Sequence, residues 1–175
     1  MKKIISLVFL LCVLPAASSM AAEQPGFYGL LGVGSSPLAY PGGSLSGYGA
    51  SIGGGYNINQ YYGIEGVLAG LGISSASEYT FTSFSASVVG HIPVYDDIGL
   101  YAKVGDGYTL ATFSPAGGGQ GSSTPISGSG AVYGAGFEFS YDGSNYRLGL
   151  DHYDLTASGV PLSTNYINVT GTTHF

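Results

Sequence analysis

The sequence predicts an all-β protein, a closed eight-stranded antiparallel up-and-down transmembrane β-barrel. Three observations lead to this prediction: charge on only 8% of the 175 residues, 31 glycines, and a regular alternation of apolar and small or polar residues. An ordinary soluble domain carries about 25% charged residues. Frequent glycine opposes helices, and a nucleic-acid-binding surface needs clustered lysine and arginine. The composition therefore argues against a helical bundle and against a nucleic-acid-binding protein.

The N-terminus is predicted to be a secretory signal peptide over residues 1–22. Two lysines precede an apolar run over residues 4–14, and small residues follow up to position 22, which is the pattern of a cleaved signal. We expect residues 23–175 to form one outer-membrane β-barrel domain. The single cysteine, Cys12, lies in the segment expected to be removed, so no disulfide is expected in the mature chain.

From residue 27 onward, segments rich in tyrosine, phenylalanine, valine, isoleucine and threonine are separated by glycine, proline, serine, asparagine or aspartate. Such segments are typical of strands. In chain order, the predicted strands are Phe27–Gly34, Gly47–Tyr56, Tyr62–Leu71, Thr80–His91, Gly99–Phe113, Gly130–Tyr141, Asn145–Leu155 and Tyr166–Phe175.

The predicted connections alternate between longer and shorter segments. The longest cover residues 35–46 and 114–129, whereas residues 57–61 and 142–144 form short turns. In an up-and-down meander, this alternation places the longer loops at one end and the tight turns at the other. Outer-membrane barrels have this arrangement, with short periplasmic turns and longer external loops.

Every second residue of these strands lies on an apolar face. A barrel strand presents alternate side chains to lipid and to the lumen. From the third strand to the eighth, the predicted lipid face includes Tyr62, Ile64 and Leu68; Phe84, Val88 and Ile92; Leu100, Ala102 and Val104; Tyr133, Phe137 and Phe139; Tyr146, Leu148 and Leu150; Ile167 and Val169. The other face is mostly small, hydroxylated or charged, which suits the filled interior of a narrow barrel.

Aromatic residues near the strand ends are expected to form two interfacial girdles. They are Phe27, Tyr56, Tyr62, Tyr141, Tyr146 and Phe175 toward the short turns, and Tyr79, Phe81, Phe113 and Tyr153 toward the long loops. One charge conflicts with the pattern, because Asp106 shares the predicted lipid face of Val104. We expect a bulge or a position at the outer rim to move this carboxylate away from lipid.

Charged residues on the predicted inward face form the candidate site. They are Glu65, Lys103, Glu138, Arg147 and Asp151. Lys103 and Arg147 are the only strong cations after the predicted signal peptide. Because an unpaired charge in a low-dielectric lumen is costly, we predict a hydrogen-bonded ion network. Two roles remain open for this network: a structural plug that specifies strand register, and a gate for a narrow ion path.

Several runs of the sequence carry a family resemblance. The segments Tyr56–Glu65, Asp97–Gly105 and Gly134–Phe139, followed by Tyr146–Leu148, resemble the OmpA-type eight-stranded outer-membrane barrel domain. The resemblance covers essentially the whole mature chain and implies a location in the bacterial outer membrane, with a barrel alone and no periplasmic domain.

The resemblance also implies roles for individual residues. Glu65, Glu138 and Arg147 match positions of the family's interior salt-bridge cluster, and Lys103 matches a basic interior position. The C-terminal Phe175 matches the residue that the barrel assembly machinery reads in such proteins.

Other candidate sites are weaker. His91, His152 and His174 do not lie at metal-ligand spacing, and we expect no metal and no cofactor. His152 lies beside Asp151 and near Asp154 in the sequence, so a lipid A-modifying enzyme stays open as a less favoured alternative.

The sequence thus favours a small non-catalytic outer-membrane barrel with a structural or surface-interaction, adhesion-like role. The main alternative is a narrow ion-conducting pore gated by the lumenal cluster. Expected partners are outer-membrane lipid and lipopolysaccharide, the barrel assembly machinery during insertion, and a host or envelope ligand at the external loops. We expect a monomer and no nucleic-acid partner.

Overall fold

The computed structural model describes residues 25–40, 43–73, 79–95, 97–113, 125–141, 144–157 and 160–175. The strands are β1 (Gly26–Ser35), β2 (Leu38–Tyr40), β3 (Gly43–Leu45), β4 (Tyr48–Asn59), β5 (Tyr62–Ile73), β6 (Tyr79–Tyr95), β7 (Ile98–Phe113), β8 (Pro125–Tyr141), β9 (Ser144–Ala157) and β10 (Val160–His174). Within these ranges no helix is long and apolar enough to cross a membrane. The predicted signal peptide lies outside the described residues.

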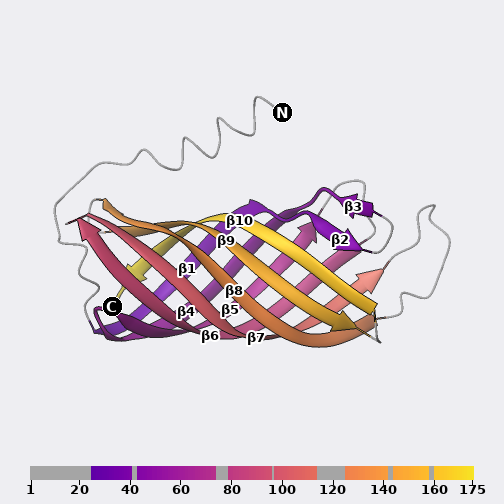
Figure 1. Cartoon of the computed structure of the whole chain (residues 1–175), viewed down its shortest axis with the longest axis horizontal. Coiled ribbons are helices and arrows are strands. Elements are labelled where there is room, and N and C mark those ends of the chain that lie inside the picture. Colours follow the sequence, from indigo (N-terminus) through magenta and orange to yellow (C-terminus); the bar gives the residue numbers. More distant parts are fainter. Residues whose placement is uncertain are drawn as a thin grey trace, which may run out of the picture.

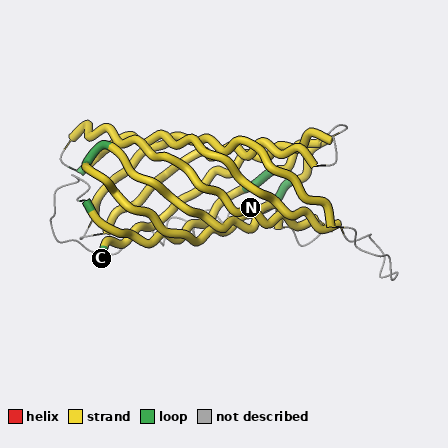
Figure 2. The backbone as a smooth tube through the Cα atoms, turned by 90° about the horizontal axis from the view of Figure 1, so that it is seen from below, coloured by secondary structure: helices red, strands yellow, loops and turns green. Residues whose placement is uncertain are grey.

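Eight long strands form a closed antiparallel barrel. Each strand of the order β1-β4-β5-β6-β7-β8-β9-β10 pairs with the next, and β1 also pairs with β10. Figure 1 shows the strands crossing obliquely around the barrel, and Figure 2 shows the same tube after a quarter turn. The predicted fold class is therefore confirmed. Tyrosine, valine and threonine favour these strands because their side chains pack well on a pleated surface.

The first long connection contains a hairpin that the sequence did not reveal. Strands β2 and β3 pair with each other, and β2 also pairs with β10. The Ser36 hydroxyl lies 3.1 Å from the Thr164 hydroxyl, which donates a 2.8 Å hydrogen bond to the Pro37 carbonyl oxygen. The hairpin therefore extends the sheet beyond the end of β1, at the end of the barrel opposite the C-terminus (Figure 1).

Two strand pairs extend further toward the long-loop end than predicted. Strand β8 begins at Pro125, inside the segment 114–129 that was predicted to be a loop. Strands β9 and β10 pair as far as Ala157 and Val160, within the predicted connection. Serine- and threonine-rich sequence indicated loops here, but strand pairing satisfies the backbone groups whatever the side chains are.

The alternation of faces agrees with the prediction along the strands. Val104, Phe84 and Leu148 are exposed on the outside, whereas Ser83 and Ser85 are buried inside. A barrel in lipid needs this reversal of soluble-protein burial, since its outer face meets hydrocarbon.

The predicted aromatic girdle at the long-loop end is wrong for Phe81 and Tyr153. Phe81 and Tyr153 are each only 1% exposed and pack inside the barrel in an apolar cluster with Leu71, Val132 and Tyr166. Their strand positions have the inward parity, and this parity overrides the general preference of aromatic residues for interfaces. The side chains of residues 79 and 113 lie outside the described part of the structure.

The bulge expected at Asp106 is absent. Strand β7 runs through this residue without a bulge, because its register with both β6 and β8 is continuous there. Asp106 lies at the middle of β7 and faces outward like Val104 and Tyr108. A regular ladder leaves no freedom to turn one side chain to the other face, so the carboxylate remains on the apolar outer face.

Candidate functional site

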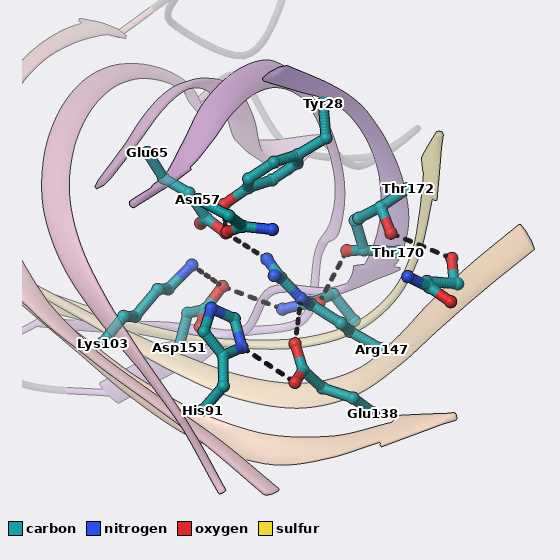
Figure 3. Close-up of polar contacts among 12 residues, drawn as sticks. Tyr28, Asn57, Glu65, His91, Lys103, Glu138, Arg147, Asp151, Thr170 and Thr172 are labelled. Carbon is teal, nitrogen blue, oxygen red and sulfur yellow. Dashed lines mark hydrogen bonds and ion pairs between the residues drawn. The ribbon is translucent and has the colours of Figure 1, made fainter. Parts of the chain in front are cut away.

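The five predicted residues lie close together inside the barrel, where Figure 3 shows their side chains pointing toward one another. Strands β5, β7 and β8 contribute one charged residue each, and β9 contributes two that are four positions apart. Residues an even number of positions apart along a strand have their side chains on the same face. The members are Glu65, Lys103, Glu138, Arg147 and Asp151, and together they are called the ionic cluster below.

Arg147 connects the carboxylates of two other strands. Its Nε donates a 2.6 Å hydrogen bond to Oε1 of Glu138, and its Nη1 donates to Oε1 of Glu65. The guanidinium also lies over two rings, 5.5 Å from the centroid of Tyr28 and 5.2 Å from that of Tyr101. Planar contacts of this kind suit arginine and not lysine. Arg147 is 4% exposed, so these neighbours replace water around its charge.

Lys103 forms the second ion pair of the cluster. Its Nζ lies 2.9 Å from Oδ2 of Asp151. The same carboxylate oxygen accepts a 3.0 Å hydrogen bond from Nδ2 of Asn168, whose Oδ1 accepts one from the Thr170 hydroxyl. A buried ion pair is stable only if further hydrogen bonds satisfy the remaining polar atoms, and the polar residues of β10 provide such bonds.

Three residues of the network were not predicted as members. The Tyr28 hydroxyl donates a 2.8 Å hydrogen bond to Glu65, and Nδ1 of His91 lies 2.9 Å from Oε2 of Glu138. Because a carboxylate only accepts, this contact places the proton of the imidazole on Nδ1. Asn168 is the third. All three stand at alternating strand positions whose side chains point into the barrel. This alternation is the signal in the sequence that could have identified them.

Close packing around the cluster explains two of the barrel's glycines. A Cβ at Gly149 would overlap the Tyr101 hydroxyl, and a Cβ at Gly55 would overlap the Tyr28 ring and hydroxyl. These glycines therefore make room for the two tyrosines that flank Arg147.

Little space remains between the side chains. Four members of the cluster, all but Glu138, bound a cavity of about 20 Å³ together with neighbours that include Leu30, Ser51, Val67 and Tyr153. A single water molecule needs at least about 10–15 Å³ by this kind of measure. The described side chains thus fill this part of the lumen almost completely.

His152 does not form the pair with Asp151 that the enzyme alternative considered. Neighbouring residues of a strand point to opposite faces, so His152 lies outside while Asp151 lies inside. The His152 ring stacks on Tyr133 with centroids 4.8 Å apart, and its Nδ1 lies 2.7 Å from Oδ1 of Asn165. The hydrogen bonds described for this part of the chain link His152 to no serine hydroxyl.

The described residues offer no metal site either, since they include no group of three or more His, Cys, Asp or Glu residues that could hold an ion. The ionic cluster itself contains carboxylates that are already paired with cationic or neutral donors. Its chemistry is therefore that of a buried ion-paired network, in which Oδ1 of Asp151 alone among the cluster's carboxylate oxygens is buried without a hydrogen-bond partner in the described part of the chain.

At the C-terminus, the Phe175 ring is 89% exposed and faces outward. Its backbone N–H donates a 3.0 Å hydrogen bond to the Phe27 carbonyl oxygen, which ties the last residue to the first strand.

The closed barrel, its apolar outer face and its polar, filled interior together define a small transmembrane barrel of the outer-membrane type. Residues 4–175 match the family model of the outer membrane protein beta-barrel domain. The chain belongs to this family.

Solved structures share the fold at low sequence identity. Neisserial surface protein A is 15% identical, with a TM-score of 0.74 over 86% of this chain and 97% of that one. Outer membrane protein OprG of Pseudomonas aeruginosa is 10% identical, with a TM-score of 0.62 over 90% and 100% of the two chains. Ail, the attachment invasion locus protein of Yersinia pestis, is 18% identical, with a TM-score of 0.57 over 86% and 99%. No curated protein sequence matches the chain.

Proposed function

We propose that the protein is a non-catalytic outer-membrane barrel with a closed lumen, and that its external end serves as an interaction surface. The observation that carries this proposal is the space of about 20 Å³ left inside the ionic cluster. Ion conduction needs a continuous path of coordinating or water-filled sites. The cluster then acts as a plug and as a core that specifies strand register, in preference to a gate.

The charge distribution limits the ligands that the external loops can recognise. After the predicted signal peptide, Lys103 and Arg147 are the only lysine and arginine of the sequence, and both are held in the ionic cluster. Recognition of a polyanion depends on clustered cationic side chains. We therefore propose an adhesion-like role toward neutral or cationic ligands, unlike Ail, which has been crystallised with the heparin analogue sucrose octasulfate.

Partners within the envelope follow from the family. We propose that the outer face contacts outer-membrane lipid and lipopolysaccharide, and that the exposed Phe175 is the signal read by the barrel assembly machinery. The structural neighbours are 10 to 18% identical to this chain and support the fold alone, so the proposal of these partners rests on the family and on the barrel's apolar outer face.

Planar-bilayer recording tests the closed lumen. The purified protein is expected to give no steady ion current, and the matched variant Asp154→Asn, which changes an exposed outer residue, is expected to behave identically. Steady unitary currents from the wild-type protein would contradict the proposal.

Mass spectrometry of lipid A after overexpression tests the absence of catalysis: an unchanged lipid A spectrum is expected, and a new acylation state would establish an enzyme instead.

A further inference from the structure

The lipid-facing surface carries a groove of about 920 Å³ over strands β1, β4, β5 and β6. Its floor is a row of small outward residues that lie opposite one another in successive ladders: Gly29, Gly54, Gly66 and Ala86. A Cβ at Gly66 would meet no atom within 4 Å, so the floor is open to the outside there, whereas the Phe175 ring lies over Gly29 and closes that end of the row. Larger side chains along one side of this row, Phe27, Tyr56, Ile64 and Val88, lie opposite one another in the same ladders and form a wall.

On β7, the next position of the same row is occupied by a carboxylate. Asp106 lies directly opposite Ala86 in the β6–β7 ladder, beside the lining residue Gly105 at the margin of the groove. Val104 and Tyr108, the outward residues on either side of it along β7, are both exposed and largely apolar. Within the described part of the chain, Oδ1 of Asp106 accepts a 2.8 Å hydrogen bond from the neighbouring Gly107 N–H. A carboxylate on a lipid-facing surface is unfavourable without a cationic partner, and here that partner must come from outside the described chain.

We propose that this groove binds a phospholipid with a primary-ammonium head group. The ammonium pairs with Asp106, and an acyl chain follows the row of small residues from Ala86 toward Gly29. Four strand spacings separate Asp106 from Gly29, which is roughly 19 Å along the surface. A primary ammonium provides three hydrogen-bond donors and a charge-assisted bond to the carboxylate, whereas the apolar walls suit hydrocarbon. This site concerns the lipid face and extends beyond the role proposed for the external loops.

A second copy of the chain does not fit the groove as well. The strong cations of the mature sequence, Lys103 and Arg147, are buried in the ionic cluster. A second barrel placed against the groove would therefore bring no strong cation to Asp106. The negative charge of Asp106 therefore favours a cationic amphiphile over a second copy of the chain as the occupant of the groove.

A second groove on the same outer face provides an internal control. It has a volume of about 860 Å³ and lies over β6, β7 and β8, with Gly90, Ala102 and Ala135 along its floor. In the ladders, this row of small residues is flanked by Tyr62 and Leu150 and not by a carboxylate. Acyl chains can occupy both grooves, but only the first combines a chain-sized channel with a head-group selector.

Electron paramagnetic resonance with spin-labelled lipids tests the proposal. The full-length barrel is reconstituted in phosphatidylcholine vesicles that contain a trace of labelled phosphatidylethanolamine, phosphatidylcholine or phosphatidylglycerol. We expect the motionally restricted fraction to show about a threefold preference for the ethanolamine lipid over the glycerol lipid, as suits a partly exposed ion pair. The choline lipid, which lacks N–H donors, should bind less well than the ethanolamine lipid.

Variants separate the two parts of the site. Asp106→Asn should abolish the preference, and Gly66→Leu, which fills the floor, should reduce it. Ala102→Leu, which fills the control groove, should leave it unchanged. A wild-type protein without the preference, a preference that survives Asp106→Asn, or one that Gly66→Leu leaves at its wild-type size would overturn the proposal. None of these outcomes bears on conduction or on lipid A, so the proposed function is tested separately.

Discussion

Two layers of side chains occupy the lumen and are held by different kinds of contact. The ionic cluster holds buried charges by paired hydrogen bonds between β5, β7, β8, β9 and β10. The second layer, with Leu71, Phe81, Val132, Tyr153 and Tyr166, is an apolar and aromatic cluster. Both are almost completely buried, but only the first depends on directional contacts.

This difference predicts how the layers respond to change. Removing one partner of a buried ion pair leaves an uncompensated charge and costs several kcal/mol. An apolar layer tolerates exchanges of similar volume, since its contacts are non-directional. The barrel therefore combines a layer that specifies which strands and residues meet with a layer that mainly excludes water.

The largest effect is expected for Arg147→Met. The variant leaves the carboxylates of Glu65 and Glu138 without their shared guanidinium, so the free energy of unfolding should fall by about 3–5 kcal/mol. Urea titration of the refolded barrel, read as the loss of the fast-migrating unheated band on a detergent gel, measures the change. A stability within about 1 kcal/mol of the wild type, in the range of an exposed pair, would show that Arg147 does not hold the cluster together.

An intermediate effect is expected for Lys103→Met. Asp151 keeps the hydrogen bond from Asn168, so the loss should be smaller than for Arg147, at about 2–3 kcal/mol. The double variant Lys103→Met, Asp151→Leu removes both charges and should be more stable than the single variant. The double-mutant cycle is completed with Asp151→Leu, and additive losses would show that the two residues are not coupled.

The smallest effect is expected in the aromatic layer. Phe81→Leu keeps an apolar side chain in the buried cluster, and its cost should be about 1 kcal/mol. The same urea titration provides the measurement, with Phe84→Leu on the outer face as the matched control. A loss as large as that of Arg147→Met would mean that the aromatic layer is as specific as the ionic cluster.

Most of the fold could be predicted from the alternation of apolar and polar residues along the strands. The faces of β5 to β10 follow from positions such as Phe84, Leu100 and Leu148, because a period of two is a local property of an extended chain. The inward parity of Glu65 and Arg147 follows in the same way. Applied consistently, the same rule would have placed Phe81 and Tyr153 inside.

Pairing partners could not be predicted in the same way. The contact between His91 and Glu138 joins β6 to β8 across the lumen, and that of Tyr28 with Glu65 joins β1 to β5. Both depend on the stagger of the strands around the closed barrel, which no single segment encodes. The β2–β3 hairpin likewise forms against β10, far away in the sequence.

By itself, the sequence determined the number of long strands, the two faces of each strand and the set of charges that had to lie inside, because these depend on local alternation and on the cost of charge in lipid. Only the tertiary structure decided which charges pair, how little space they leave, and that Asp106 ends a row of small residues on the outside. These features arise from register across several ladders, which is set when the barrel closes.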